Sequence, residues 1–216
     1  MTNFKNELNG ERLERIIRKE IMPKLEAHGG EQSEEFITRF IKRSKLRPFA
    51  KDQYLEESRD FADGKLFYLI SGIARTVYYP TANDKPVIPR IWKKGEVIFD
   101  VNSFKNETER IESIQMLEEG EAITISYDSI KELLKDFPNM VSFLLCLQAE
   151  RENYSRYYQR LLKLAAEESV AMYLQDNPGI EHRINKDIIA LYLGISRSKF
   201  SSAYTLYKQK LQLFFI

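Results

Sequence analysis

The C-terminal stretch KDIIALYLGISRSKFSSAYTLY, residues 186–207, decides what the last part of this chain is expected to form. Asn185 stands where it can cap a first helix, and Ser196 stands where it can cap a second. Between them, Gly194 allows the positive φ that a tight turn between two helices needs. One set of small and apolar side chains has the spacing to hold two helices at a steep angle: Ile189, Ala190, Leu193, Ile195, Phe200 and Ala203. These features predict a helix-turn-helix.

The second predicted helix has a short-chained, polar and basic outward face. This face consists of Arg197, Ser198, Lys199, Ser201, Ser202 and Thr205. It suits the major groove of double-stranded DNA, where Arg197 would bond a guanine bidentately and Lys199 would reach a base or a phosphate. We expect Lys186 and Lys208 to add contacts, the latter to a phosphate. The alternative is a helical hairpin that only packs against the rest of the chain.

The distribution of charge supports contact with DNA more than the net charge does. The 216-residue chain has a formal net charge of only +1. Residues 183–216 nevertheless hold six lysines and arginines against one acid, Asp187, whereas residues 107–121 hold six glutamates against Arg110. Because phosphate contact depends on local charge, the basic C-terminal segment favours a nucleic-acid partner.

The composition is that of an ordinary folded protein, 43% apolar and 30% charged. Apolar runs such as residues 143–147 fall far short of the ~20 residues that a membrane span needs, and residues 1–9 lack the apolar core of a secretion signal. We therefore expect a cytoplasmic protein without membrane contact. The single cysteine, Cys146, allows no internal disulfide and no all-cysteine cluster, and its apolar neighbours predict a buried side chain.

Changes in the hydrophobic pattern divide the chain into four predicted parts. Apolar residues at helical spacing come first, with Pro23 and the Gly29-Gly30 pair expected to separate two helices. Many short apolar runs separated by turns follow and are typical of a sandwich or roll. The predicted parts are a helical segment (1–45), the region of short strands (46–126), a helical connector (127–165) and the helix-turn-helix domain (166–216).

The connector contains a long helix with a heptad-like apolar stripe that lasts three heptads and is interrupted by an arginine. The stripe consists of Met140, Leu144, Leu147, Arg151, Tyr154, Tyr158 and Leu161. A stripe of this kind can pair with a copy of itself, so we expect it to form a homodimer. The alternative is that this face packs on the chain's own strands.

Four segments resemble the Crp/Fnr family of transcription regulators. They are FYLISGIAR (67–75), KGEVI (94–98), IQMLE (114–118) and IALYLGISR (189–197). The resemblance spans residues 46–210 and implies an α+β fold: a β-roll effector domain like those that bind cyclic nucleotides (a double-stranded β-helix), a long dimerisation helix and a winged helix-turn-helix. It also implies a dimer that binds DNA, contacts RNA polymerase and responds to a small-molecule effector.

The sequence departs from the family pattern in the segment that binds cyclic nucleotides. Asp100 and Arg110 stand where the family has its ribose- and phosphate-binding pair, and with Tyr68 and Phe99 they are the candidate effector-binding residues. The glycine that lets backbone approach a phosphate is missing, and Glu112 adds a negative charge. We therefore expect no response to cyclic AMP. The alternative for Asp100 and Arg110 is a solvated surface turn.

Two further departures concern the C-terminal part. The family reads DNA with an Arg-Glu-x-x-x-Arg pattern, of which only Arg197 remains, because Ser198 and Ser202 replace the other two residues. Residues 208–216 are too few for a full hairpin wing, so we expect a short or missing wing. Five apolar side chains in this segment are expected to pack back as a stub: Leu211, Leu213, Phe214, Phe215 and Ile216.

The sequence offers no catalytic, metal or cofactor signature. His28 and His182 are isolated in polar surroundings and are expected at the surface rather than as haem or metal ligands. Clustered histidines, a glycine-rich phosphate loop and a nucleophile elbow are all missing, so we do not expect an enzyme. The sequence therefore predicts a sequence-specific DNA-binding regulator. The alternative is a degenerate effector-binding or protein-interaction module that does not bind specific DNA.

Overall fold

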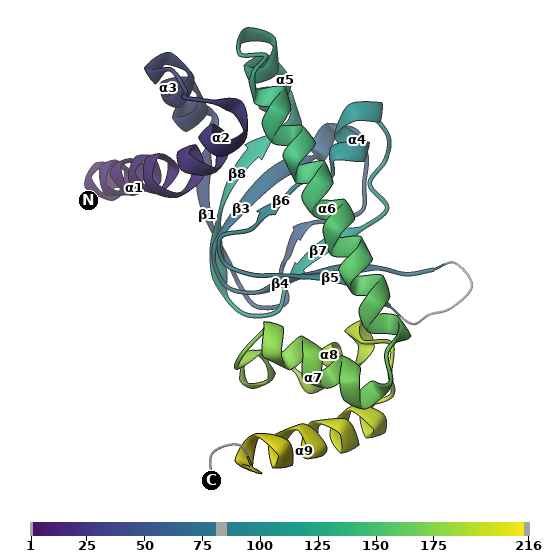
Figure 1. The fold of residues 1–216 in the computed structure, drawn as a ribbon. Coiled ribbons are helices and arrows are strands. Elements are labelled where there is room, and N and C mark those ends of the chain that lie inside the picture. The colour runs from purple at the N-terminus through teal and green to yellow at the C-terminus, as the bar shows by residue number, and fades with distance from the viewer. Residues whose placement is uncertain (1, 81–85, 214–216) are drawn as a thin grey trace. The chain divides into compact units, whose positions relative to one another are not determined.

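The computed structural model describes residues 2–80 and 86–213 and has the α+β fold predicted from the sequence (Figure 1). Its helices are α1 (Thr2–Ile16), η1 (Ile17–Ile21), α2 (Met22–Gly29), α3 (Glu34–Arg43), η2 (Phe61–Asp63), α4 (Val101–Asn106), α5 (Tyr127–Asp136), α6 (Met140–Lys163), α7 (Ala166–Asp176), η3 (Ile180–His182), α8 (Lys186–Tyr192) and α9 (Arg197–Leu213). Its strands are β1 (Lys45–Phe49), β2 (Tyr54–Glu56), β3 (Lys65–Ser71), β4 (Ala74–Tyr78), β5 (Val87–Trp92), β6 (Val97–Ile98), β7 (Ser113–Met116) and β8 (Gly120–Ser126).

The chain divides into two compact units. We call Met1–Ala74 with Trp92–Arg151 the roll unit, and Arg75–Ile91 with Glu152–Ile216 the helix-turn-helix unit. The long helix α6 begins in the first unit and ends in the second. The four-part division predicted from the sequence stays a prediction, since these units follow packing rather than the order of elements along the chain.

The roll unit is built on antiparallel strands. One sheet has the order β1-β8-β3-β6, and β2 pairs with β7. Successive side chains of β3 point to opposite faces, as a strand requires. Phe67 and Leu69 therefore join a cluster inside the roll, whereas Leu66, Tyr68 and Ile70 pack on the outer face with the helices.

Apolar side chains fill the inside of the roll. The buried members of this inner cluster are Leu55, Phe67, Leu69, Ala74, Trp92, Ile98, Ile114, Met116 and Ala122. The turn between β3 and β4 depends on Gly72, whose φ is 93°. A Cβ atom there would lie 2.6 Å from Met116 Cε and 3.0 Å from the carbonyl oxygen of Glu119, so glycine alone fits.

The N-terminal helices pack on the outer face of the roll. Ser33 begins α3 by accepting a hydrogen bond from the amide of Phe36 at 3.1 Å. The predicted break at Gly29-Gly30 is confirmed, because α2 ends at Gly29 and α3 begins at Glu34. The predicted break at Pro23 is wrong, because α1, η1 and α2 follow one another from Thr2 to Gly29. Pro23 lies in the first turn of α2, after a π-helical turn, and there its missing N–H costs little.

The helix-turn-helix unit contains β4, β5, the end of α6, and the helices from α7 to α9. Residues 208–213 continue α9, and the side chain of Leu211 is half-buried there. Phe214, Phe215 and Ile216 lie outside the described residues. Within residues 2–80 and 86–213, no strand follows α9, and no helix has the length and hydrophobicity that crossing a bilayer requires.

Candidate nucleic-acid interface

The predicted helix-turn-helix forms between α8 and α9. Asn185 Oδ1 accepts a hydrogen bond from the amide of Asp187 at 2.8 Å, and Ser196 Oγ accepts one from the amide of Lys199 at 3.3 Å. Gly194 has the positive φ that the turn needs, 67°. A Cβ atom at this position would lie 3.1 Å from Leu162 Cδ2, so a side chain would be crowded as well as strained. Both helices therefore begin where the capping residues predicted.

Buried apolar contacts hold α8 and α9 together. Five of the residues chosen from their spacing are buried: Ile189, Ala190, Leu193, Phe200 and Ala203. Ile195 is half-buried, and its amide donates to the carbonyl oxygen of Ala190 at 3.0 Å, which closes the turn. The helices of this motif are thus positioned by packing and not only by their caps.

A cluster of tyrosines supports α8 from behind. Tyr192 is fully buried, and its ring lies 5.1 Å from that of Tyr158 and 5.0 Å from that of Tyr173, between ring centroids. The hydroxyl oxygens of Tyr192 and Tyr154 lie 2.9 Å apart. Burial raises the pKa of Tyr158 to about 12, so this side chain is neutral at physiological pH. Tyr192 and Tyr173 were not predicted as supports, although the density of tyrosine in this region is a usable signal.

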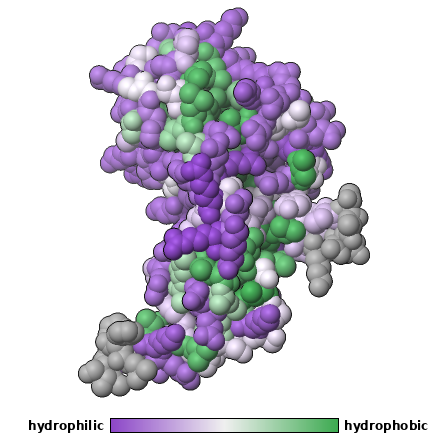
Figure 2. Space-filling model, turned by 45° about the vertical axis from the view of Figure 1, so that its right-hand side comes forward, coloured by the Kyte–Doolittle hydropathy of each residue, from purple (hydrophilic) through white to green (hydrophobic). Residues whose placement is uncertain are grey.

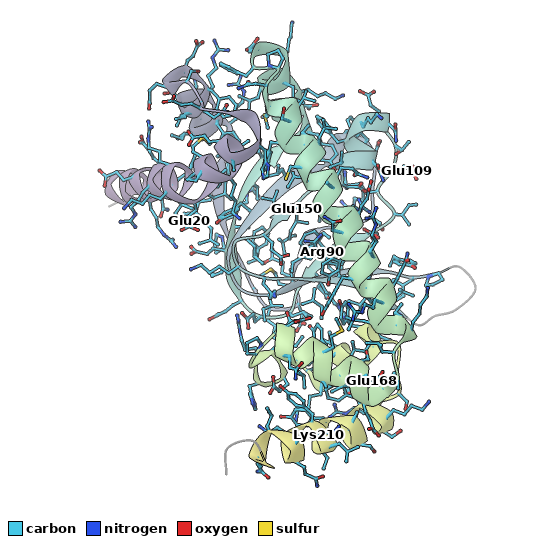
Figure 3. The ribbon with its side chains drawn as sticks, in the orientation of Figure 1. Glu20, Arg90, Glu109, Glu150, Glu168 and Lys210 are labelled. Atoms are coloured by element: carbon cyan, nitrogen blue, oxygen red, sulfur yellow. The ribbon has the colours of Figure 1, made fainter. Side chains whose placement is uncertain are left out.

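The tyrosine cluster also connects the helices to strand β5. The guanidinium carbon of Arg90 lies 4.3 Å from the centroid of the Tyr154 ring (Figure 3), a cation–π contact. The backbone amide of Ile91 donates to Tyr154 Oη at 3.5 Å. Tyr154 therefore contacts both β5 and α8 within this unit.

The candidate DNA-binding residues share the outer side of the motif. Those on α9 are all exposed: Arg197, Ser198, Lys199, Ser201, Ser202, Thr205 and Lys208. Lys186 differs, because it is half-buried and its Nζ lies 4.4 Å from the centroid of the Tyr204 ring. The exposed residues carry positive charge and short hydroxyl side chains, which is the chemistry that contacts with phosphates and base edges require.

An intramolecular ion pair orients the first arginine of this face. Arg197 Nε lies 2.9 Å from Asp187 Oδ1, and both side chains are at least half-exposed. A cation at the N-terminus of a helix is disfavoured by the helix dipole, and the carboxylate offsets that repulsion. The contact uses the Nε edge of the guanidinium, so Nη1 and Nη2 can still form a fork toward a ligand. Asp187 was counted only as the one acid of the segment and was missed as a positioning residue.

Two of the candidate effector residues lie on the outer face of the roll, against helices. Tyr68 Oη donates a 2.8 Å hydrogen bond to Oε2 of Glu20, which lies on η1 (Figure 3). The Phe99 ring centroid lies 5.2 Å from that of Phe104 and 5.3 Å from that of Tyr127. Both residues belong to the outer core cluster, so neither lines the inside of the roll. The expectation that they face an effector is therefore not supported by their packing.

The other two candidate effector residues are held by internal contacts. Arg110 is 3% exposed, so the alternative that it sits in a solvated turn is wrong. Its Nη1 donates to the carbonyl oxygen of Asp60 at 2.7 Å, and its Nε lies 3.4 Å from Glu56 Oε1. Asp100 caps α4 by accepting hydrogen bonds from the amides of Asn102 and Ser103. A sequence turn cannot reveal such burial, because it depends on strands distant along the chain.

Three carboxylates and two guanidinium groups gather in this part of the roll unit. Arg151 contacts Asp100 Oδ1 at 2.9 Å and Glu112 Oε2 at 3.4 Å. Burial raises the pKa of Glu56 to about 7, while the nearby Arg110 acts in the opposite direction. Burial also raises the pKa of Glu112, again against the charge of Arg151. The chain's own carboxylates therefore face the two arginines of this cluster.

The stripe predicted to dimerise is largely occupied within the chain. Met140, Leu144 and Leu147 are buried in the outer core cluster of the roll unit, and Leu161 is fully buried. Arg151 contacts Asp100 and Glu112, as described above, and Tyr154 and Tyr158 belong to the tyrosine cluster. Its first part therefore packs on the roll of its own chain, as in the alternative, and the role of the stripe as a dimer seam stays a prediction.

A different face of α6 is exposed. Val141 and Leu145 are 47% and 65% exposed, and Leu162, near the other end of the helix, is 45% exposed. Apolar side chains form a green band on the roll unit in the space-filling view (Figure 2). Cys146 is half-buried with Sγ 3.9 Å from Glu150 Oε1, so the expectation of full burial is wrong. The heptad pattern located a buried face, and the exposed apolar residues flank it.

The described part of the chain has no group of three or more histidine, cysteine or carboxylate side chains that could hold a metal ion. Both histidines, His28 and His182, are exposed, in agreement with the sequence-based expectation. Some of the predicted DNA-binding side chains also contact other groups of the chain: Lys186, Arg197, Ser198 and Thr205. The assembled site is therefore a polar, basic helix surface and not a pocket of reactive groups.

The chain was compared with known proteins by sequence and by structure. No protein-family model and no curated protein matches the sequence. Among solved structures, the c-di-GMP responsive global regulator CLP from Xanthomonas campestris matches with a TM-score of 0.64 and 20% identity over 84% of this chain and 92% of that one. FixK2 from Bradyrhizobium japonicum matches with a TM-score of 0.66 and 14% identity, over 77% and 85%. A CooA mutant from Carboxydothermus hydrogenoformans matches with a TM-score of 0.59 and 17% identity, over 78% of both chains.

These structural neighbours are Crp/Fnr family regulators. At such sequence identities, the likeness establishes the fold. The chain therefore combines a cyclic-nucleotide-binding-like roll with a C-terminal helix-turn-helix, as the resemblance of its four segments predicted.

Proposed function

We propose that this chain is a cytoplasmic, sequence-specific DNA-binding transcription regulator of the Crp/Fnr type. The observation that carries the proposal is the outer surface of α9, where exposed cations and hydroxyls follow a capped, glycine-containing turn. A helix presented in this way enters the major groove with its N-terminal residues toward the base edges. The regulator type of the structural neighbours supports the same conclusion.

Arg197 is the proposed guanine reader. Its Nε is occupied by Asp187, and the two Nη groups form the fork that matches O6 and N7 of guanine. Ser198 and Ser202 are the neighbouring readers, so the operator differs from one read by an Arg-Glu-x-x-x-Arg helix. A bidentate contact of this kind contributes ~1–3 kcal/mol of discrimination between bases.

The regulator acts as a homodimer in this proposal. Two copies of α9 would then lie one DNA turn apart, about 34 Å, and read a palindromic site. The exposed apolar side chains of α6, Val141 and Leu145, are the proposed pairing surface in place of the buried stripe. Contact with RNA polymerase is proposed from the regulator type of the structural neighbours and not from any surface described above.

The roll is proposed to work without a cyclic nucleotide. The inner cluster fills the space between the strands with apolar side chains, and Arg110 already faces Glu56. An anionic ligand would have to displace that carboxylate and bring its own charge into a buried site, which is costly. A c-di-GMP response belongs to CLP, and this proposal does not extend it to the present chain.

Selection of duplexes from a random pool tests the proposed function. The parent protein is expected to enrich a palindromic consensus and to bind it at least ~10³-fold more tightly than random duplex at physiological salt. Arg197→Ala should relax one base position per half-site and cost ~1–3 kcal/mol. Lys42→Ala, which removes an exposed cation from the roll unit, is the matched control and should leave the consensus unchanged.

Two outcomes would contradict this function. If the parent binds selected and random duplexes equally, the chain is instead a degenerate effector-binding or interaction module with a basic surface. If Arg197→Ala yields the parent consensus, Arg197 does not read a base.

A further inference from the structure

The recognition helix α9 is longer than the reading of a half-site by its first turns requires. It runs over 17 residues, Arg197–Leu213. At 1.5 Å per residue it is about 24 Å long, twice the width of the major groove. Its sequence, RSKFSSAYTLYKQKLQL, contains no acidic residue. The whole length of the helix is therefore chemically compatible with DNA, not only its N-terminus.

A neutral polar strip runs along the outer side of α9. Ser198, Ser202, Thr205 and Gln209 are all exposed, and they follow one another at intervals of four, three and four residues. Residues at these intervals share one face of a helix. The strip lies opposite the buried side chains Phe200 and Ala203, which hold α9 in the motif. Hydroxyl and amide side chains in such a line are donors and acceptors suited to base edges.

Cations flank this strip on both sides, in two pairs. Arg197 and Lys208 form one pair, and Lys199 and Lys210 form the other; all four side chains are exposed (Lys210 is labelled in Figure 3). Members of a pair are eleven residues apart, which is close to three full turns, so they lie on the same edge of the helix about 16 Å from each other. The two pairs are about 200° apart around the helix axis, one on each side of the strip.

This arrangement matches the cross-section of the major groove. The groove exposes base edges at its floor, and the phosphates of the two strands line its two walls. A helix lying lengthwise in the groove would direct the neutral strip at the floor, Lys208 at one wall, and Lys199 and Lys210 at the other. The long Arg197 side chain, at the N-terminal end of its edge, would reach to the floor and read the guanine. Lysines near a helix C-terminus also favour the helix dipole, but that role requires no particular edge and leaves the double-sided placement unexplained.

We propose that the C-terminal half of α9 makes a second set of DNA contacts, with Lys208 and Lys210 at phosphates of opposite strands and Gln209 at a base edge between them. An adenine, which offers an acceptor and a donor side by side, is the base that a glutamine side chain pairs with bidentately. This inference rests on the proposed function and extends the operator beyond the positions that Arg197 and its neighbours read.

Salt dependence tests the phosphate contacts. Each contact contributes about 0.9 to the slope of log affinity against log salt on duplex DNA, so Lys208→Ala/Lys210→Ala should flatten the slope by about 1.8. Between 50 and 200 mM salt, the advantage of the parent over this double variant should then shrink about twelvefold. The loss should be similar on selected and random duplexes. Lys42→Ala/Lys135→Ala, which removes two exposed cations from the roll unit, is the control and should keep the parent's slope.

Duplex selection tests the base contact. Gln209→Ala should lose preference at one base pair of each half-site, other than the one read by Arg197, and should keep the parent's salt slope. Circular dichroism should show that the variants retain the helix content of the parent, so that unfolding of α9 does not mimic a lost contact.

The outcomes distinguish a failure of the second set of DNA contacts from a failure of the proposed DNA-binding function. If the parent shows no preference for any duplex, both fail. If Arg197→Ala loses its base preference while Lys208→Ala/Lys210→Ala keeps the parent's slope and Gln209→Ala keeps its consensus, the function stands and the second set of contacts is refuted.

Discussion

Replacing Arg110 by methionine tests whether the charge of this arginine is balanced inside the roll unit by the Glu56 carboxylate. The side chain is 2% exposed and lies 3.4 Å from a Glu56 carboxylate that is itself 8% exposed. The substitution keeps a long side chain in place but removes the charge and the hydrogen bond to the carbonyl oxygen of Asp60. Glu56 is then left as a buried carboxylate without its cation.

The expected loss of stability is large and depends on pH. Removing one partner of a buried ion pair costs ~3–5 kcal/mol, because the remaining charge keeps its desolvation penalty. That cost applies above pH 7, where Glu56 is ionised in the parent. At pH 5 the lone carboxyl takes up a proton instead, so the cost falls. Glu56→Gln/Arg110→Met should recover part of the loss at pH 8, leaving ~1–3 kcal/mol, since the Asp60 carbonyl oxygen still lacks its donor.

Urea unfolding followed by tryptophan fluorescence measures this cost in the right part of the molecule. Trp92 is the single tryptophan of the chain and is buried in the inner cluster of the roll, so its signal reports on the roll unit. With a slope of ~2 kcal/mol per molar urea, the midpoint of Arg110→Met should fall by ~1.5–2.5 M at pH 8. A shift below ~0.5 M, or one equally large at pH 5 and pH 8, would refute the buried pair and return Arg110 to the candidate effector-binding residues.

Three further predictions follow from single contacts. Because the pKa of Glu56 is raised, the folded state keeps a proton that the unfolded chain loses between about pH 4.5 and 7. The free energy of unfolding should therefore fall with rising pH across that window and level off above it. Urea titrations at several pH values should show this decline, and it should be smaller in Glu56→Gln. Gly194→Ala should destabilise the helix-turn-helix unit by ~1–2 kcal/mol, because alanine is strained at φ 67° and its Cβ meets Leu162. Thermal unfolding followed by circular dichroism should detect a lower midpoint. An unchanged midpoint would count against the turn geometry. Asp187→Asn should raise affinity for random duplex, because it removes a negative charge from the surface that meets DNA. It should also reduce discrimination at the base read by Arg197, because it removes the contact that orients this arginine. Equal effects on selected and random duplexes in a binding titration would show that Asp187 does not orient the arginine.

Local features of the fold were predictable from the sequence. The helix-turn-helix depends on caps, one glycine and apolar residues at helical spacing, all within about twenty consecutive residues, and Asn185, Gly194 and Ser196 take the roles expected of them. The exposed polar face of α9 follows from the same spacing. For the same reason, residues of this face that lie further along the helix, such as Gln209, could have been found by extending the pattern.

Contacts between distant segments were not predictable. Tyr68 looked like a ligand-facing residue, but its place in the alternation of β3 directs it toward η1, where its hydroxyl donates a hydrogen bond to Glu20. Arg110 looked solvated because its neighbours are polar, yet Glu56 and Asp60 enclose it from about fifty residues away. A single sequence without pairing information carries no signal for such partners.

The chain's own sequence thus determined where the helices of the DNA-binding motif start and turn, and which side of α9 is polar and basic. Only the tertiary structure decided which face of α6 is buried and which carboxylates face Arg110 and Arg151. The physical reason is the distance along the sequence over which each kind of interaction acts. Caps, turns and periodicity act between residues a few positions apart, whereas burial and ion pairing depend on which surfaces meet after the chain has folded.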